Sequence, residues 1–306
     1  DLMADVFQQT LTKLSLPGAV ASSFPELMPK ATRDRLHSHG IPALQGVEDG
    51  LAAIARVMRY NICREQILAQ SDGADQILIP GPVSTNGISI DEWESKKQLS
   101  ECGLKIPDGR LVNKDQVKEA AEELGCPVAI KIVSNEMQHK TEMGAVAVNI
   151  SSLDEAVIAA EEMVQRVSSN YPNFNTNNLL VEKMLKEPVA ELLVGIKREQ
   201  GFGFALVIGS GGTMVELSQD TITLLLPTTK EAVEQALKKL KIAKVLEGFR
   251  GQASGDIEST IEAIITIAKY ADSKADSLIE LDVNPLMVMN DGAIAVDAYI
   301  RLASKT

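Results

Sequence analysis

The chain has 306 residues, of which 45% are hydrophobic and 24% are charged, a globular composition with room for two or three compact units. Its formal charge of −12 excludes a sequence-independent nucleic-acid binder, since phosphate neutralisation requires clustered Lys and Arg, and it favours small-molecule partners. The three cysteines form no CxxC pair and no apolar run approaches the ~20 residues that span a bilayer, so we expect a cytoplasmic protein without a disulfide framework, a zinc site or a membrane segment.

The first 62 residues predict a small α/β segment that is too short to fold alone. After a helix over residues 2–14, the expected elements are a helix over 31–39, a strand over 41–44, and a helix that Asp49 caps and that continues to about Tyr60. Since the chain begins with Asp1 and not with methionine, we expect this segment to belong to a longer parent protein.

Residues 63–87 predict a linker. Gly, Pro, Ser and Asn surround the short apolar run QILIP within it, which indicates one extended segment between two domains. The main domain boundary is therefore expected here, and residues 88–306 are expected to form the larger domain.

The larger domain mixes helices and strands. Helices are expected over residues 91–102, 113–124, 152–167, 230–240 and 256–270. Their starts carry cap signals at Asn113, at Ser152 with Glu155, at Thr228 with Glu231, and at Asp256. Strands are expected over residues 128–133, 145–150, 179–184, 190–197, 204–208 and 222–226. Several of these strands follow one another without an intervening helix, so part of the sheet must be antiparallel.

The first candidate for chemistry is Lys131, within the apolar run of residues 128–133. One interpretation is an edge-strand lysine whose stem is buried and whose ammonium reaches water. The other is a buried lysine that binds an anion, because desolvating an ammonium without a partner costs several kcal/mol. The polar, glycine-containing segment that follows can reach back over such a ligand, which predicts a nucleotide-phosphate site beside a loop that carries His139.

Glycines after the apolar run of residues 204–208 are a second candidate. The sequence GSGGT, residues 209–213, is either an ordinary turn or a loop whose backbone N–H groups converge on phosphate oxygens. It lacks the Lys-Ser or Lys-Thr of a Walker motif. Arg250, between two predicted helices, is either an anion clamp or a cation at a helix end.

The chain closes with LIELDVNPLMVM, NDG and AIAVDAYI, which predict a β-hairpin. A two-residue turn at Asp291-Gly292 makes Asn284 and Asp297 diagonal neighbours on one face of the hairpin. Strand alternation places Glu280 and Asp282 on the same face. Such a face is either solvated or binds a cation, and its hard oxygen ligands suit a Mg²⁺ ion that carries nucleotide phosphates.

His139 lies in the polar segment after Lys131. A lone histidine in a loop is ordinarily exposed to solvent, but the neighbouring Lys140 and Thr141 favour a second interpretation. The neutral imidazole is a competent nucleophile near pH 7, so His139 is a candidate carrier of a phosphoryl group.

A string of segments resembles, in order and spacing, the ATP-grasp domain of the NDP-forming acyl-CoA synthetases, relatives of succinyl-CoA synthetase. The segments are GCPVAIKIVSNEMQHKTEMGAV, LLVEKM, AELLVGIKREQGFG, VIGSGGTMVELSQD, GFRG, and ELDVNPLMV followed by AVDAYI. The resemblance covers about residues 88–301. Residues 1–62 are similar to the end of the flavodoxin-like CoA-ligase domain that precedes the ATP-grasp domain in fused members. The expected fold is therefore an α+β ATP-grasp domain of two subdomains that carries the C-terminal piece of a flavodoxin-like α/β domain.

The resemblance implies that acid, CoA and ATP give acyl-CoA, ADP and phosphate through an acyl phosphate and phosphorylated histidines. The roles that it implies are nucleotide binding by Lys131, Glu182, Glu191, Gly209, Gly211, Gly212 and Arg250, Mg²⁺ binding by Asn284 and Asp297, phosphoryl transfer by His139, and orientation of His139 by Asp282. Glu182 would lie near adenine and ribose. The CoA-binding domain, a first phosphorylated histidine and most of the acid pocket are expected in a partner domain or subunit outside this chain.

The segment after His139 departs from the family pattern, because Lys-Thr-Glu-Met-Gly-Ala follows it here where the family has an aspartate and paired glycines. Two other functions stay open at this point. One is a nucleotide-sensing regulatory module of an acetyltransferase-like fusion without ligase activity. The other is an ATP-grasp ligase that joins a carboxylate to an amine, against which the CoA-ligase-like segment argues.

Overall fold

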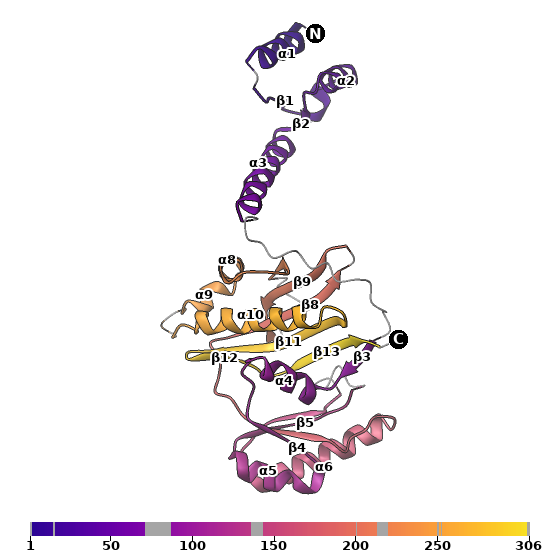
Figure 1. Ribbon diagram of the computed structural model, residues 1–306, viewed down its shortest axis with the longest axis vertical. Coiled ribbons are helices and arrows are strands. Elements are labelled where there is room, and N and C mark those ends of the chain that lie inside the picture. Colours follow the sequence, from indigo (N-terminus) through magenta and orange to yellow (C-terminus); the bar gives the residue numbers. More distant parts are fainter. Residues whose placement is uncertain are drawn as a thin grey trace. The chain divides into compact units, whose positions relative to one another are not determined.

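The computed structural model describes residues 2–14, 16–70, 87–135, 143–199, 201–212, 220–249, 251 and 253–304. The chain divides into two compact units, Asp1–Gln76 and Ile77–Thr306 (Figure 1). We call them unit 1 and unit 2.

Unit 1 is built around a strand–helix–strand arrangement. Its parallel strands β1 (Val20–Ser22) and β2 (Ala43–Gln45) are connected through a short 3-10 helix (Pro25–Leu27) and α2 (Lys30–Ser38). Its core is small, and the buried apolar residues described there are Met28, Leu36 and Ile41.

Two further helices, α1 and α3, flank this arrangement, and α3 differs from the sequence prediction in two ways. Helix α1 (Leu2–Leu14) has the predicted bounds. Helix α3 (Val47–Gln70) starts early enough that Asp49 lies in its first turn and not at the cap, and it continues well beyond Tyr60 into the predicted linker. No Gly or Pro follows Gly50 within α3, and Ala, Leu, Met, Arg and Gln dominate it. These are strong helix formers, so nothing in the segment ends the helix.

Unit 2 contains two sheets. The larger sheet has the strand order β10-β9-β8-β11-β13-β3, with β12 paired to β11. Its strands are β3 (Gly87–Ile90), β8 (Ala190–Glu199), β9 (Gly203–Ser210), β10 (Thr221–Leu225), β11 (Leu278–Met289), β12 (Gly292–Ala295) and β13 (Ala298–Ala303). The smaller sheet has the order β4-β7-β5-β6, from strands β4 (Gly109–Val112), β5 (Val128–Ile132), β6 (Val146–Ile150) and β7 (Leu179–Lys183). All of these pairings are antiparallel, which confirms the prediction for that part of the chain.

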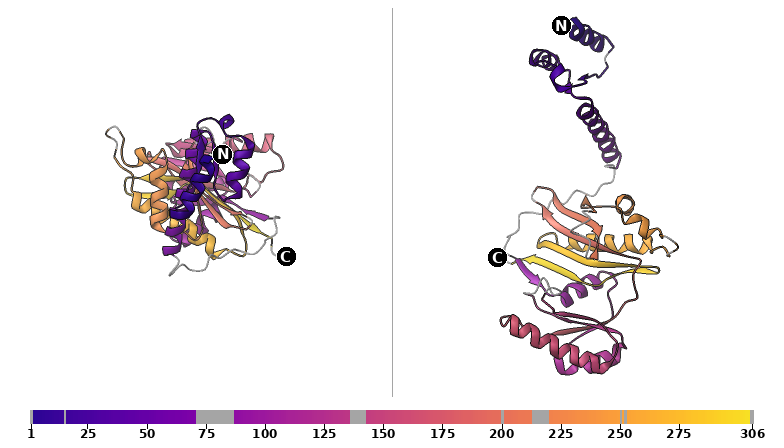
Figure 2. Two further views of the ribbon diagram at one scale, coloured as in Figure 1. Left: turned by 90° about the horizontal axis from the view of Figure 1, so that it is seen from above. Right: turned by 180° about the vertical axis from the view of Figure 1, so that it is seen from behind.

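Helices cover one face of each sheet (Figure 1). Buried residues of α8 (Lys230–Lys239) and α10 (Ile257–Ser273) join those of β8, β9 and β11 in one core. Buried residues of α5 (Val117–Leu124) and α6 (Leu153–Asn170) form a second core with the smaller sheet. Seen from behind, the strands of the larger sheet lie in front of α10, so the opposite face of that sheet is turned away from this helix (Figure 2).

The other helices in the described residues of unit 2 are α4 (Glu92–Glu101), α9 (Ala243–Leu246) and the 3-10 helix Lys114–Gln116. The predicted caps Asn113, Ser152 and Asp256 each accept a hydrogen bond from a backbone N–H of the first turn. The prediction for Thr228 was wrong by one residue, because the Thr229 hydroxyl accepts from the N–H of Ala232. Two consecutive threonines satisfy the same cap pattern. None of the helices in the described ranges is both long and apolar enough to cross a bilayer.

The closing hairpin is present, but its register differs from the prediction. Met289 pairs with Gly292, so the turn residues are Asn290 and Asp291 instead of Asp291-Gly292. Asn, Asp and Gly all suit turns, so the sequence NDG permits either loop. From Glu280 onward the change moves the pairings of β11 by two residues, and since strand side chains alternate with a period of two, these residues stay on their predicted face.

Candidate active site

Strand β5 confirms the prediction of a buried strand that carries Lys131. All of its residues are buried, and the Lys131 ammonium donates hydrogen bonds to Glu92 Oε1 at 2.6 Å and to the carbonyl of Val296 at 2.9 Å. It also lies 3.1 Å from Glu182 Oε2. The interpretation of a lysine that reaches water is therefore wrong, and the anions that accompany Lys131 here are two carboxylates of the protein itself.

Lys96 and Glu92, which the sequence analysis did not select, belong to the same site. Lys96 is fully buried and donates to Glu92 Oε1 at 2.8 Å, to Glu182 Oε1 at 2.5 Å and to the Val296 carbonyl at 3.0 Å. We call Glu92, Lys96, Lys131 and Glu182 the charge cluster. A Glu and a Lys four residues apart on a helix are ordinarily an ion pair exposed to solvent. The apolar Leu99 on the same face is the signal in the sequence that this face of α4 is buried.

The charge cluster keeps Lys131 protonated. Burial acts to lower the pKa of Lys131, but the carboxylates of Glu92, Glu182 and Asp297 outweigh it and raise that pKa above its usual value. Asp297 directly follows Val296, whose carbonyl accepts hydrogen bonds from Lys96 and Lys131. The cluster therefore joins α4, the smaller sheet and the segment before β13 around two ammonium groups.

A face of β11 carries like charges, as predicted. Leu281 and Val283 are buried in the helix-covered core, so alternation puts Glu280 and Asp282 on the other face of the sheet. Burial, Asp297 and Glu280 raise the pKa of Asp282 to about 6. We call the carboxylates of Glu280, Asp282 and Asp297 the acidic face.

Two contacts shape the surroundings of the acidic face. Asp282 lies opposite Gly195 of β8, where an added Cβ would come within 3.3 Å of Asp282 Oδ1, so the missing side chain makes room for the carboxylate. The N–H of Asn284 donates to the carbonyl of Asp297 at 3.3 Å. The corrected register thus brings Asn284 and Asp297 opposite each other instead of diagonally.

The glycines after β9 permit a close approach to Glu191. The Gly211 N–H donates to the Glu191 carbonyl at 2.7 Å, and an added Cβ on Gly211 would lie 2.8 Å from the Glu191 carbonyl carbon. Gly212 has a φ of +75°, and its added Cβ would lie 2.6 Å from Glu191 Oε2. Gly209 lies within β9, where an added Cβ would come 2.9 Å from the carbonyl of Asp220. The glycines therefore have a packing role, and their contact with phosphate stays a prediction.

His139 and Arg250 lie outside the described residues. The structure brings Lys131 together with Glu182 in the charge cluster, Asp282 with Asp297 at the acidic face, and Glu191 with Gly211 and Gly212. Within the described ranges, no group of three or more His, Cys, Asp or Glu side chains is arranged to hold a metal. A metal at Asn284 and Asp297 would therefore require ligands from a substrate or from water.

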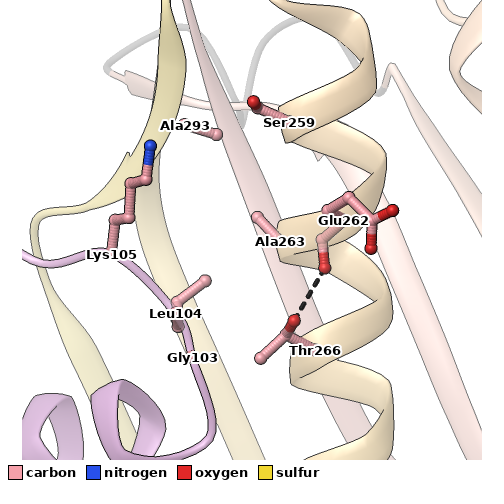
Figure 3. Close-up of a pocket in the computed structure, with 8 residues that line it drawn as sticks. All are labelled: Gly103, Leu104, Lys105, Ser259, Glu262, Ala263, Thr266 and Ala293. Carbon is pink, nitrogen blue, oxygen red and sulfur yellow. Dashed lines mark hydrogen bonds between the residues drawn. The ribbon is translucent and has the colours of Figure 1, made fainter.

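A small cavity of unit 2 lies elsewhere (Figure 3). Its volume is about 100 Å³, and its lining comes from the segment after α4, from α10 and from β12: Gly103, Leu104, Lys105, Ser259, Glu262, Ala263, Thr266 and Ala293. Since α10 packs on the face of the larger sheet opposite the acidic face, the cavity is separate from the candidate site. It is also smaller than the roughly 300 Å³ at which ligand pockets begin.

Comparisons with known proteins place this arrangement in a family. Residues 84–302 match the family described as ATP-grasp domain. The β subunit of ADP-forming acetate–CoA ligase II from Pyrococcus furiosus is 32% identical over 214 residues, 69% of this chain and 90% of that subunit. The ADP-forming acetate–CoA ligase of Methanocaldococcus jannaschii is 32% identical over 294 residues, which are 89% of this chain and 40% of that protein.

Solved structures agree with these matches. A chain of the dinucleotide-forming acetyl-coenzyme A synthetase 1 of Ca. Korarchaeum cryptofilum, in complex with coenzyme A and Ca-AMPCP, superposes with a TM-score of 0.67 and 32% identity over 70% of this chain and 93% of that chain. The expected α+β ATP-grasp fold is thus confirmed. The chain belongs to the ATP-grasp family and, within it, to the relatives of the ADP-forming acid–CoA ligases.

Proposed function

We propose that this chain is the ATP-binding part of an ADP-forming acid–CoA ligase, which converts acid, CoA and ATP into acyl-CoA, ADP and phosphate through an acyl phosphate and a phosphohistidine. The observation that carries the proposal is the pairing of a protonated, buried Lys131 with a nearby acidic face in a chain of this family. The first can bind a nucleotide phosphate and the second can bind the cation that accompanies it. The acid itself stays unassigned.

In this proposal Lys131 contacts the phosphates of ATP, and the backbone N–H groups of the glycine segment neutralise charge on the phosphoryl group as it transfers. Gly209, Gly211 and Gly212 belong to that segment, and the Gly211 N–H would leave the Glu191 carbonyl in order to take part. Glu182 and Glu191 bind the nucleoside side of ATP, and Arg250 contacts phosphate. His139 accepts the phosphoryl group on a ring nitrogen and releases a proton.

Asp282 would orient His139. With a pKa of about 6, its carboxylate is mostly ionised near neutral pH and can accept the N–H of an imidazole ring. That hydrogen bond would leave the opposite ring nitrogen free to attack the phosphoryl group. A protonated Asp282 would be a weaker acceptor for the imidazole N–H of His139. The proposal therefore predicts weaker phosphorylation of His139 below pH 6.

Asn284 and Asp297 would hold Mg²⁺. The amide and the carboxylate supply hard oxygen ligands. The pKa of Asp282 is raised first by burial and then by the carboxylates of Asp297 and Glu280, and a divalent cation would relieve this surplus of negative charge. One or two protein oxygens are enough for Mg²⁺, which keeps waters and substrate phosphates as its other ligands. When bound, the ion would neutralise negative charge on the phosphates of ATP.

For unit 1 we propose the end of a flavodoxin-like CoA-ligase domain over residues 1–62, followed by a linker over 63–87 whose start α3 occupies. The M. jannaschii match covers 89% of this chain, more than unit 2 contains, so the alignment extends into unit 1. The parallel β1–β2 pair with its connecting α2 suits the edge of a larger parallel sheet. CoA would then bind mainly to a partner domain or subunit.

A labelling experiment tests the proposal. Incubation of the parent protein with γ-labelled ATP and Mg²⁺ should give an acid-labile protein label, and His139→Ala should remove it. A label that His139→Ala leaves unchanged would contradict the role of His139. Magnesium-dependent ATP binding without any label or thioester would instead favour the nucleotide-sensing regulatory module.

A further inference from the structure

The two lysines of the charge cluster share the same acceptors. Lys96 and Lys131 both donate to Glu92 Oε1 and to the Val296 carbonyl. Glu182 offers one carboxylate oxygen to each lysine, Oε1 to Lys96 and Oε2 to Lys131. The two ammonium groups therefore share the same three acceptor groups, and each lysine contacts all three of them.

The two lysines differ in access to solvent. The side chain of Lys96 is 0% exposed, and its three hydrogen bonds use all the donors of an ammonium. The Lys131 side chain is 7% exposed, and its contacts with the same acceptors occupy it equally. For Lys131 to contact a phosphate, at least one of these contacts must therefore be given up.

Giving up such a contact ordinarily carries a large penalty, because a buried acceptor without a donor loses its full solvation. The cluster avoids this penalty, since Lys96 still donates to Glu92, Glu182 and Val296 after Lys131 turns away. The charge is balanced as well. Two ammonium groups face two carboxylates, whereas Lys131 alone would leave a net negative cluster that repels a phosphate.

We propose that Lys96 is a positioning residue that holds Glu92, Glu182 and the Val296 carbonyl in place while Lys131 turns to a phosphate oxygen of the nucleotide. This inference rests on the proposed function, in which ATP binds at Lys131. Val296 directly precedes Asp297, so the bond from Lys96 also holds the backbone next to the proposed metal residue. Lys96 itself does not touch the nucleotide.

The test compares affinities of the chain for Mg-ATP and for adenosine, measured by titration calorimetry. Lys96→Met removes the second donor, so Lys131 stays bound to the three acceptors. We expect ATP to bind about tenfold more weakly, the equivalent of one buried acceptor left unsatisfied. Adenosine has no phosphate, so its affinity should fall less than that of ATP and only through the displaced Glu182. Lys118→Met is the matched control, since it removes the same charge from an exposed lysine of unit 2, and it should change neither affinity.

Glu92→Gln gives an effect of the opposite sign. The amide oxygen still accepts from a lysine, but the lost negative charge loosens the hold on Lys131 and leaves the cluster positive, so ATP should bind more tightly than to the wild-type chain. A merely structural role would weaken binding in both variants. If Lys96→Met does not fold, as judged by urea unfolding followed through Trp93, the sign of the Glu92→Gln effect decides alone.

Three results would overturn the inference: ATP affinity unchanged in folded Lys96→Met, ATP and adenosine affinities reduced alike in that variant, or ATP affinity reduced in Glu92→Gln. A wild-type chain that binds no ATP would be a different failure. It would overturn the proposed function, and this inference with it, before any variant is compared.

Discussion

The charge cluster and the acidic face both lie in unit 2 and both contain carboxylates. In the cluster the carboxylates are paired with lysines, whereas at the acidic face they face one another. In the cluster, Glu92 and Glu182 are matched by Lys96 and Lys131, and both lysines are held by hydrogen bonds and ion pairs. At the acidic face, burial raises the pKa of Asp282 to about 6, and the neighbouring carboxylates of Asp297 and Glu280 add to the shift. In the first region the charges are balanced and hydrogen-bonded, and the second changes its charge near pH 6.

The difference shows how a single site can bind both parts of a metal–nucleotide complex. A balanced cluster contributes stability and still tolerates an incoming phosphate, because no net charge repels it. A crowded acidic face costs stability until a proton or a cation arrives. Asp297 affects the pKa of both Lys131 and Asp282, so it connects the two regions.

The largest expected effect comes from breaking the balanced region. In Glu182→Ala the two buried lysines of the cluster share only the carboxylate of Glu92, so one buried positive charge has no partner. This should lower the free energy of unfolding by about 3–5 kcal/mol. Urea unfolding of the chain measures this loss. A loss below about 1 kcal/mol would mean that water replaces the carboxylate and that the lysines of the cluster do not depend on buried partners.

The acidic face should respond with the opposite sign. The pKa of Asp282 in the folded chain, about 6, exceeds its ordinary value of 3.8, so the folded state binds the proton more tightly than the unfolded state. Stability from this group is therefore present below about pH 4 and is lost as the pH rises through 6. Asp282→Asn should stabilise the chain by on the order of 2–3 kcal/mol at pH 8.

The control for this prediction is the same pair of chains at pH 4, where the gain from Asp282→Asn should disappear. Equal stabilisation at both pH values would show that the carboxylate is not crowded and would remove the contrast between the two regions.

In the parent protein the same variant should lose histidine phosphorylation, because the amide no longer accepts the imidazole N–H as a charged group.

A smaller effect is expected where the larger sheet makes room for Asp282. The added methyl of Gly195→Ala would lie 3.3 Å from Asp282 Oδ1, which crowds and further desolvates the carboxylate. We expect a loss of about 1 kcal/mol in unfolding free energy and a shift of the Asp282 transition to higher pH. The free energy of unfolding, measured between pH 4 and pH 8, gives the midpoint pH of the Asp282 transition. A midpoint at lower pH than in the wild-type chain would contradict this prediction.

The smallest effect is expected outside both regions. Lys118 and Asp154 form an ion pair at 3.1 Å with both side chains mostly exposed, and water screens such pairs. Lys118→Met should change the free energy of unfolding by less than about 0.5 kcal/mol. A change as large as that of Glu182→Ala would show that burial is not what separates the charge cluster from other ion pairs.

Much of the fold could be predicted because local signals and tertiary structure agree. The apolar run around Lys131 formed a buried strand, and helix caps at Asn113, Ser152 and Asp256 lie where predicted. Errors arose where two neighbouring residues satisfy one signal equally, as with Thr228 and Thr229, or where the signal to end a helix is missing, as in α3. The roles of His139 and Arg250 stay predictions.

The sequence by itself determined that Lys131 lies in a buried strand and that Asp282, Asn284 and Asp297 share one face of the closing hairpin, because strand alternation and apolar runs are local properties. Only the tertiary structure decided which groups accompany them. Glu92 and Lys96 are a surface-like pair in sequence, and their burial depends on the packing of α4 against strands far away in the chain. Charge partners are chosen by that packing, since an ion pair requires proximity in space and leaves no periodic trace in the sequence.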